Sequence, residues 1–116
     1  MSTHKELDIW KRSIRFVTDI YSETKRFPKE EMFGLTSQIR RFAVSIPSNI
    51  AKGAARKNKA ENIQSLHIAL GSYSELETQL IISRNLKYLD CDRLFNELSV
   101  IGKMLVNFIK FQKNKR

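Results

Sequence analysis

Apolar residues recur at alternating steps of three and four in four separate blocks of the chain. This spacing places them on one face of an α-helix. The first block ends at Pro28, because the residue before a proline is pushed away from the helical region. Thr3 and Glu6 have the spacing of a capping box at its start. The expected core positions of this helix are Leu7, Trp10, Ile14, Val17, Tyr21 and Thr24.

The second block begins near Phe33 and contains a proline, Pro47, in its interior. A proline inside a helix removes one backbone hydrogen bond and clashes with the preceding turn. A break that opened a new helix at Pro47 would make Ile46 the N-cap, and isoleucine has no side-chain acceptor for that role. The pattern therefore favours one kinked helix over two separate helices. Its expected core positions are Leu35, Ile39, Phe42, Ile46, Ile50 and Gly53.

The third block opens at Asn58, with Glu61 at capping-box spacing, and the fourth follows Asp90 and Asp92, either of which could cap it. Helices of about 22–26 residues joined by short loops pack most simply as an antiparallel bundle. The sequence therefore predicts one all-α domain over residues 1–116, an up-down-up-down four-helix bundle. The remaining expected core positions are Ile63, Leu66, Leu70, Tyr73, Glu77, Leu80 or Ile81, Leu94, Leu98, Ile101, Leu105 and Phe108.

Charged residues are sparse on the second and third predicted helices, although an outer helix of a monomeric bundle normally carries a continuous charged face. The third helix instead has small and apolar residues opposite its main stripe. They are Ser65, Ala69, Ser72, Leu76 and Ser83, with Ile68 and Ile82 on the flank. We therefore expect a homo-oligomer with its interface along these two helices. The alternative is a polar surface that merely tolerates serine and alanine.

Glu77 lies in the middle of an apolar stripe. A buried carboxylate costs several kcal/mol unless it is paired and hydrogen-bonded. Arg40 and Arg41 lie midway along the neighbouring antiparallel helix, so we expect a structural ion pair between Glu77 and these arginines. A catalytic role for Glu77 is the alternative, but no nearby residues complete a reaction centre.

Residues that support catalysis or metal binding are few. His4, His67 and the single cysteine, Cys91, do not have the spacing of a zinc site, and the glycines lack the spacing of a phosphate loop. We therefore expect no enzyme activity, no cofactor and no metal. The start of the chain does not resemble a signal peptide, one cysteine cannot form an internal disulfide, and no apolar run is long enough to span a membrane. These features favour a cytoplasmic protein.

The chain carries 21 Lys and Arg against 12 Asp and Glu, a net charge of +9. One basic cluster, Lys52, Arg56, Lys57 and Lys59, surrounds the turn between the second and third predicted helices. The other, Lys110, Lys113, Lys115 and Arg116, ends the chain. An antiparallel bundle brings both to the same end, and a ring of subunits would multiply their field. We expect binding of RNA or DNA through phosphates, with little sequence selectivity because no helix-turn-helix or aromatic stacking signature is visible. Ordinary solubilising charge is the alternative.

Several stretches, spread over almost the whole chain, match the motifs of a known family. They are residues 7–11 (LDIWK), 27–31 (FPKEE), 34–41 (GLTSQIRR), 45–51 (SIPSNIA) and 70–80 (LGSYSELETQL). These stretches resemble the bacterial proteins encoded in intervening sequences of 23S ribosomal RNA genes, a family also described as ribosomal-protein-like. The resemblance implies a four-helix bundle that assembles as a homopentamer and has no established enzymatic activity.

The same resemblance suggests possible partners. A related branch, the accessory proteins of diversity-generating retroelements, forms a basic pentameric barrel that associates with a reverse transcriptase and nucleic acid. The alternative function for this chain is therefore a protein-interaction scaffold, or an accessory subunit of such a nucleic-acid enzyme. The sequence departs from the family pattern at Lys52, where glutamate is common, and at Ala54 and Ala55. The lysine makes this end of the bundle more basic, which favours a polyanionic partner.

Overall fold

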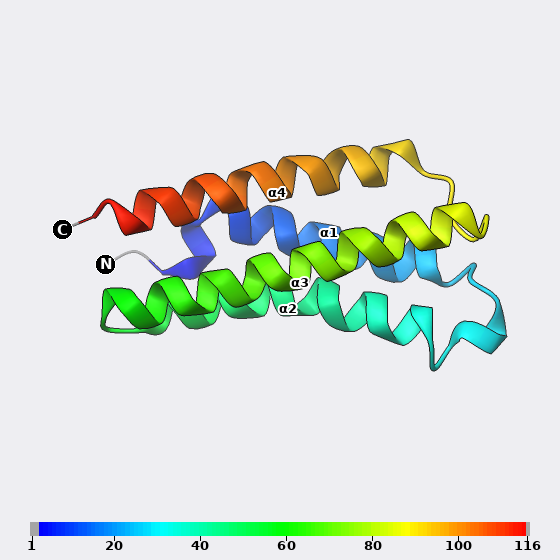
Figure 1. Cartoon of the computed structure of the whole chain (residues 1–116), viewed down its shortest axis with the longest axis horizontal. Helices are drawn as coiled ribbons and strands as arrows, with labels where there is room; N and C mark the ends of the chain where they lie inside the picture. The colour runs from blue at the N-terminus through cyan, green and yellow to red at the C-terminus, as the bar shows by residue number, and fades with distance from the viewer. Residues whose placement is uncertain (1–2, 116) are drawn as a thin grey trace.

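The computed structural model describes residues 3–115, which form four long α-helices and two short 3-10 helices (Figure 1). The elements are η1 (His4–Glu6), α1 (Asp8–Thr24), η2 (Lys29–Glu31), α2 (Leu35–Ala55), α3 (Lys59–Asn85) and α4 (Asp92–Lys113). Successive long helices run in opposite directions, and the bundle extends 48 × 24 × 21 Å (Figure 1). The predicted all-α four-helix bundle is confirmed. None of the described helices is long and apolar enough to cross a membrane.

The first helix starts later than predicted, and its core-facing side overlaps the predicted one only in part. Thr24 is buried as predicted, and Leu7, Trp10 and Val17 are partly buried against the core. Thr3 provides no side-chain cap, and α1 begins at Asp8. Ile14 and Tyr21, expected in the core, are 40% and 41% exposed. The buried positions of α1 are Ile9, Ser13, Phe16, Ile20 and Thr24. Ser13 and Thr24 fit there because each hydroxyl donates to the backbone carbonyl four residues earlier, at 2.7 Å in both cases.

The second helix runs through Pro47 without a break, which confirms the prediction of one helix. Its start is set by η2, because Oε1 of Glu31 accepts a hydrogen bond of 3.2 Å from the backbone amide of Leu35. Phe33, predicted near the start of the helix, lies just outside it and is 94% exposed. The loop before α2 therefore presents an aromatic side chain to solvent.

The small-residue face of α3 packs against α2 inside the chain, so its prediction as a subunit interface is wrong. Oγ of Ser72 lies 2.7 Å from Oγ of Ser45 on α2. Gly53 of α2 also approaches α3 closely, since an added Cβ would lie 3.2 Å from the backbone oxygen of Asn62. Ser65, Ala69, Ser72, Leu76 and Ser83 are all buried. Small side chains on both helices allow this close contact, whereas the flanking Ile68 and Ile82 are exposed.

The fourth helix buries the stripe that the sequence predicts, with Leu94, Leu98, Ile101 and Leu105 in the core. Its N-cap is Cys91, without a side-chain cap, so neither Asp90 nor Asp92 has the predicted role. The Asn58 cap of α3 is confirmed, because its side chain accepts a 2.8 Å hydrogen bond from the amide of Glu61.

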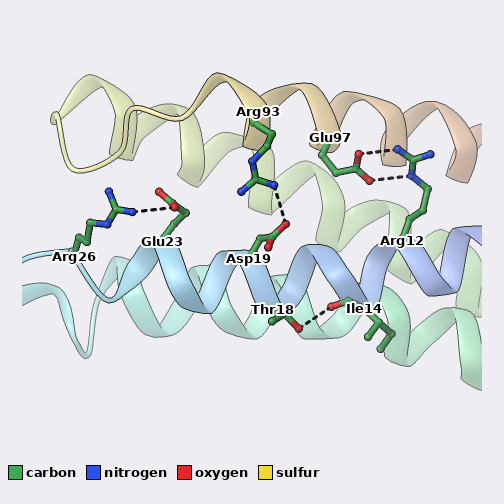
Figure 2. Close-up of polar contacts among 8 residues, drawn as sticks. All are labelled: Arg12, Ile14, Thr18, Asp19, Glu23, Arg26, Arg93 and Glu97. Atoms are coloured by element: carbon green, nitrogen blue, oxygen red, sulfur yellow. Dashed lines mark hydrogen bonds and ion pairs between the residues drawn. The ribbon is translucent and has the colours of Figure 1, made fainter.

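Ion pairs join α4 to α1 along the surface of the bundle. Arg12 donates to both carboxylate oxygens of Glu97, at 2.9 and 2.7 Å, and Arg93 contacts Asp19 at 3.3 Å (Figure 2). The hydrogen bond from Arg12 lowers the pKa of Glu97 from its ordinary value, while the same contact raises the pKa of Arg12. These charged pairs connect the surfaces of α1 and α4.

Candidate nucleic-acid interface

Three segments that are far apart in the sequence meet at one end of the bundle. The α2–α3 turn, the last turn of α4 and η1 all lie at this end (Figure 1). Nζ of Lys59 donates a 2.6 Å hydrogen bond to the backbone carbonyl of Lys115, which ties α3 to the end of the chain. The two basic clusters therefore meet, as the antiparallel arrangement predicts.

An open hollow of about 400 Å³ lies between these segments. Four cationic residues line it, namely Arg56, Lys57, Lys59 and Lys115, and no acidic residue does. Within residues 3–115, Lys57, Lys59 and Lys115 form no ion pair with another side chain. We call this feature the basic hollow. Its uncompensated charge attracts anions, and its open shape suits a chain of phosphates better than a small enclosed ligand.

Not every predicted binding residue lines the basic hollow. Lys52 lies on the α2–α3 flank beside Arg56 and Glu61. The Arg56–Glu61 pair there is long, at 4.0 Å, and exposed, so it restrains Arg56 little. Lys110 and Lys113 are exposed on the last turns of α4 but do not line the hollow. Lys115 does line it, whereas Arg116 lies outside the described residues.

The predicted ion pair of Glu77 with Arg40 or Arg41 does not form. No ion pair within the described part of the chain involves Glu77, which is exposed next to the buried Leu76. Arg40 instead donates to Oγ1 of Thr24 at 2.9 Å and lies 4.7 Å above the Tyr21 ring. The guanidinium of Arg41 lies over the ring of Phe42. Because Glu77 faces solvent, its carboxylate needs no buried partner. Both arginines instead pack against aromatic rings.

Histidine and cysteine side chains are dispersed over the structure. His4 packs edge-on against Trp10, with ring centroids 5.1 Å apart. His67 is exposed on α3. Among residues 3–115, no group of three or more His, Cys, Asp and Glu side chains could hold a metal ion.

Comparison with known proteins assigns the chain to a family. The sequence profile of the 23S rRNA-intervening sequence proteins matches residues 5–107. The chain belongs to this family. This family member is also similar to a solved structure, the crystal structure of a protein of unknown function from the S23 ribosomal protein family of Bacteroides thetaiotaomicron VPI-5482. The two are 27% identical with a TM-score of 0.79, over 88% of this chain and 95% of that one. Comparison with curated proteins gives no match.

The family match includes only part of the basic end of this intervening sequence protein. The α2–α3 turn, with Arg56, Lys57 and Lys59, lies inside the matched residues. The last turns of α4, with Lys110 and Lys113, lie beyond residue 107, and so does Lys115, which follows the helix. The basic hollow therefore combines a segment within the family match with one outside it.

Proposed function

We propose that this intervening sequence protein is a non-enzymatic homo-oligomer that binds RNA or DNA through the basic hollow. The convergence of four cationic residues from separate segments, with no acidic residue between them, supports this function. Release of condensed counterions makes such binding favourable at low salt and weak at high salt. Because the contacts are to phosphates, they position the nucleic acid without reading its sequence.

The two kinds of cation in the basic hollow contribute differently to phosphate binding. The planar guanidinium of Arg56 can donate two parallel hydrogen bonds to one phosphate, whereas Lys57, Lys59 and Lys115 act as mobile point charges. The first turn of α3 also lies at this end, and the positive end of its helix dipole favours anions there. Arg56 should therefore orient the strand, and the lysines should supply most of the salt-dependent affinity.

Charge reversal in the hollow tests the binding proposal. Lys57→Glu/Lys59→Glu should weaken binding of a labelled 23S rRNA fragment at least about tenfold and reduce the salt slope by about two, measured by fluorescence anisotropy over a salt series with duplex DNA as competitor. Lys25→Glu/Lys29→Glu is the matched control, because it makes the same charge change at the opposite end of the bundle. Equal losses in the two variants would reject the basic hollow as the site, and no binding by the wild type at low salt would reject the function.

The homo-oligomer part of the proposal has its support on α1 and α2. A hollow of about 340 Å³ lies between these helices, lined by apolar side chains that include Trp10, Val17 and Pro47. Ile14 and Val44, both 40% exposed, also border it. A helix from a second copy could cover this surface and remove its apolar area from water. Assembly would also bring several basic hollows into one field.

Single charge insertions can test which face mediates self-association. Ile14→Glu should convert an assembled wild-type protein to monomers in sedimentation velocity, because a carboxylate in an apolar interface is strongly unfavourable. Ile68→Glu, on the flank of α3, should leave the assembly intact. If Ile68→Glu alone dissociates the assembly, the interface lies on α3 instead of on α1 and α2. A monomeric wild type would reject self-association.

The same apolar surface supports an alternative function, a scaffold for another protein such as a reverse transcriptase. A wild type that is monomeric and does not bind nucleic acid would favour that alternative. In that case Ile14→Glu should abolish binding of the enzyme partner, whereas Lys57→Glu/Lys59→Glu should leave it largely unchanged.

A further inference from the structure

Phe111 is a large aromatic side chain that the fold leaves in solvent. It lies near the end of α4 and is 59% exposed. Its neighbour Phe108, by contrast, is partly buried and packs against the hydrophobic core. The cation–π contact recorded for its ring is with Nζ of Lys115, 5.4 Å from the ring centroid. A flexible lysine is easily displaced, so a face of this ring is available to a ligand.

The surroundings of Phe111 are strongly positive. From residue 98 to residue 115 the chain has four lysines and no aspartate or glutamate. Lys110 and Lys113 flank Phe111 in sequence, and Lys115, four residues after Phe111, lines the basic hollow. The other highly exposed phenylalanine, Phe33, follows Glu30 and Glu31 in sequence. It belongs to the segment before α2, and this segment lies at the opposite end of the bundle (Figure 1). Of these two phenylalanines in the described part of the chain, Phe111 is the one that has an exposed ring among cations and no acidic neighbour in sequence.

We propose that Phe111 is a stacking platform for an unpaired nucleobase, so that the basic end binds single-stranded nucleic acid in preference to duplex. This inference rests on the proposed function and specifies its ligand. Every base has a flat π-face that can stack on an aromatic ring, while neighbouring cations hold the phosphates of the same strand. Inside a duplex both faces of a base are already stacked, so the ring of Phe111 gains nothing there.

Charge complementarity favours a nucleic acid over a protein on this ring. A second copy of the chain carries +9, and burying Phe111 against it would bring positive charge close to several lysines without a counterion. A single strand supplies both complementary features, π-faces for the ring and phosphates for the lysines. Because stacking tolerates any base, the inference agrees with weak sequence selectivity.

Substitution of Phe111 tests the inference with two probes of equal length, labelled oligouridylate and a labelled RNA duplex. The wild type should bind the single strand more tightly at the same salt concentration. Phe111→Ala should lose roughly 5- to 100-fold in affinity for the single strand and little for the duplex. Phe111→Trp should retain the affinity, and oligouridylate should quench its fluorescence more than it quenches Trp10 in the wild type. Phe33→Ala is the matched control and should bind both probes normally.

Failure of this inference is distinguishable from failure of the proposed function. If Phe111→Ala binds oligouridylate as tightly as the wild type, or loses affinity for both probes by the same factor, the proposal of base stacking is wrong. The proposal of phosphate binding is unaffected by that result. If Phe111→Ala changes the sedimentation coefficient of the nucleic-acid-free protein, the ring is a protein contact and the inference is overturned. If the wild type binds neither probe, both proposals fail.

Discussion

The contacts of α2 with α3 and of α1 with α4 join neighbouring helices by different means. Between α2 and α3, small side chains allow close approach, as at Gly53 and at the 2.7 Å contact of Ser45 with Ser72. Between α1 and α4, long charged side chains reach across the surface (Figure 2). The Arg12 and Glu97 side chains of the shorter pair are 36% and 27% exposed. One contact depends on shape, and the other depends partly on charge.

This difference bears on which part of the bundle should loosen first. Close packing of buried groups is insensitive to salt, whereas exposed ion pairs contribute little and are screened by salt. Local opening therefore should begin at α4 rather than between α2 and α3. Since α4 carries Phe111 and leads directly to Lys115, the same opening would change the geometry of the basic hollow.

The largest expected effect comes from overfilling the contact between α2 and α3. Ala69 is fully buried on the small-residue face of α3. Ala69→Leu should lower the free energy of unfolding by about 1–3 kcal/mol, because the added atoms force the two helices apart or into strained rotamers. Urea denaturation followed by circular dichroism measures this change. A stability equal to that of the wild type would show that the contact has room to spare and that small residues are not required there.

The sequence predicts the number of helices and their order, because apolar periodicity and capping residues act locally. It also predicts the buried stripe of α4 and most of that of α2, but it does not predict the full buried faces of α1 and α3. In α1, two sets of residues have helical spacing, and the set with Trp10 and Tyr21 looks more apolar than the buried set with Ser13, although both sets end at Thr24. The polar members of the buried set satisfy their own hydroxyls within the helix, which hydropathy alone does not reveal.

The candidate site, too, can be predicted from the sequence in outline but not residue by residue. The meeting of the two basic clusters follows from antiparallel topology, so it is predictable from the sequence. The position of each cation is not: Lys52 lies on the flank, while Lys115 lines the basic hollow. The predicted ion pair of Glu77 is wrong for a related reason. The buried position on α3 is Leu76, and Glu77, one residue later, faces solvent. Phe111 is apolar and close to a stripe, so only its exposure distinguishes it from a core residue.

A smaller effect, of opposite sign, is expected two residues away from Ala69 on the same helix. Gly71 lies in the interior of α3, is exposed, and has open space where a Cβ would be. Gly71→Ala should raise the free energy of unfolding by about 0.5–1 kcal/mol, because alanine loses less conformational entropy in a helix. Together with Ala69→Leu in the same urea assay, it separates helix propensity from packing between α2 and α3. Destabilisation by Gly71→Ala would mean that a neighbouring chain contacts this position.

The smallest expected effect concerns the charged contact of α1 with α4, and it depends on pH. Arg12 lowers the pKa of Glu97 in the folded protein, chiefly through their hydrogen bond. A carboxylate with a lowered folded pKa stabilises the fold above its unfolded pKa, and this contribution disappears as the pH falls through the folded pKa. Glu97→Gln should therefore destabilise the protein slightly at pH 7 and make little difference well below the ordinary value of 4.5.

Thermal unfolding of the wild type and Glu97→Gln at pH 7 and at pH 3 measures this convergence. Glu6→Gln, an exposed substitution on η1 outside the α1–α4 contact, is the control for the general effect of removing one negative charge. High salt at pH 7 should also reduce the difference between Glu97→Gln and the wild type, because it screens the pair. A difference that persists unchanged at low pH and in high salt would indicate that Glu97 acts through packing. The contact of α1 with α4 would then resemble that of α2 with α3, and the contrast between the two helix pairs would no longer hold.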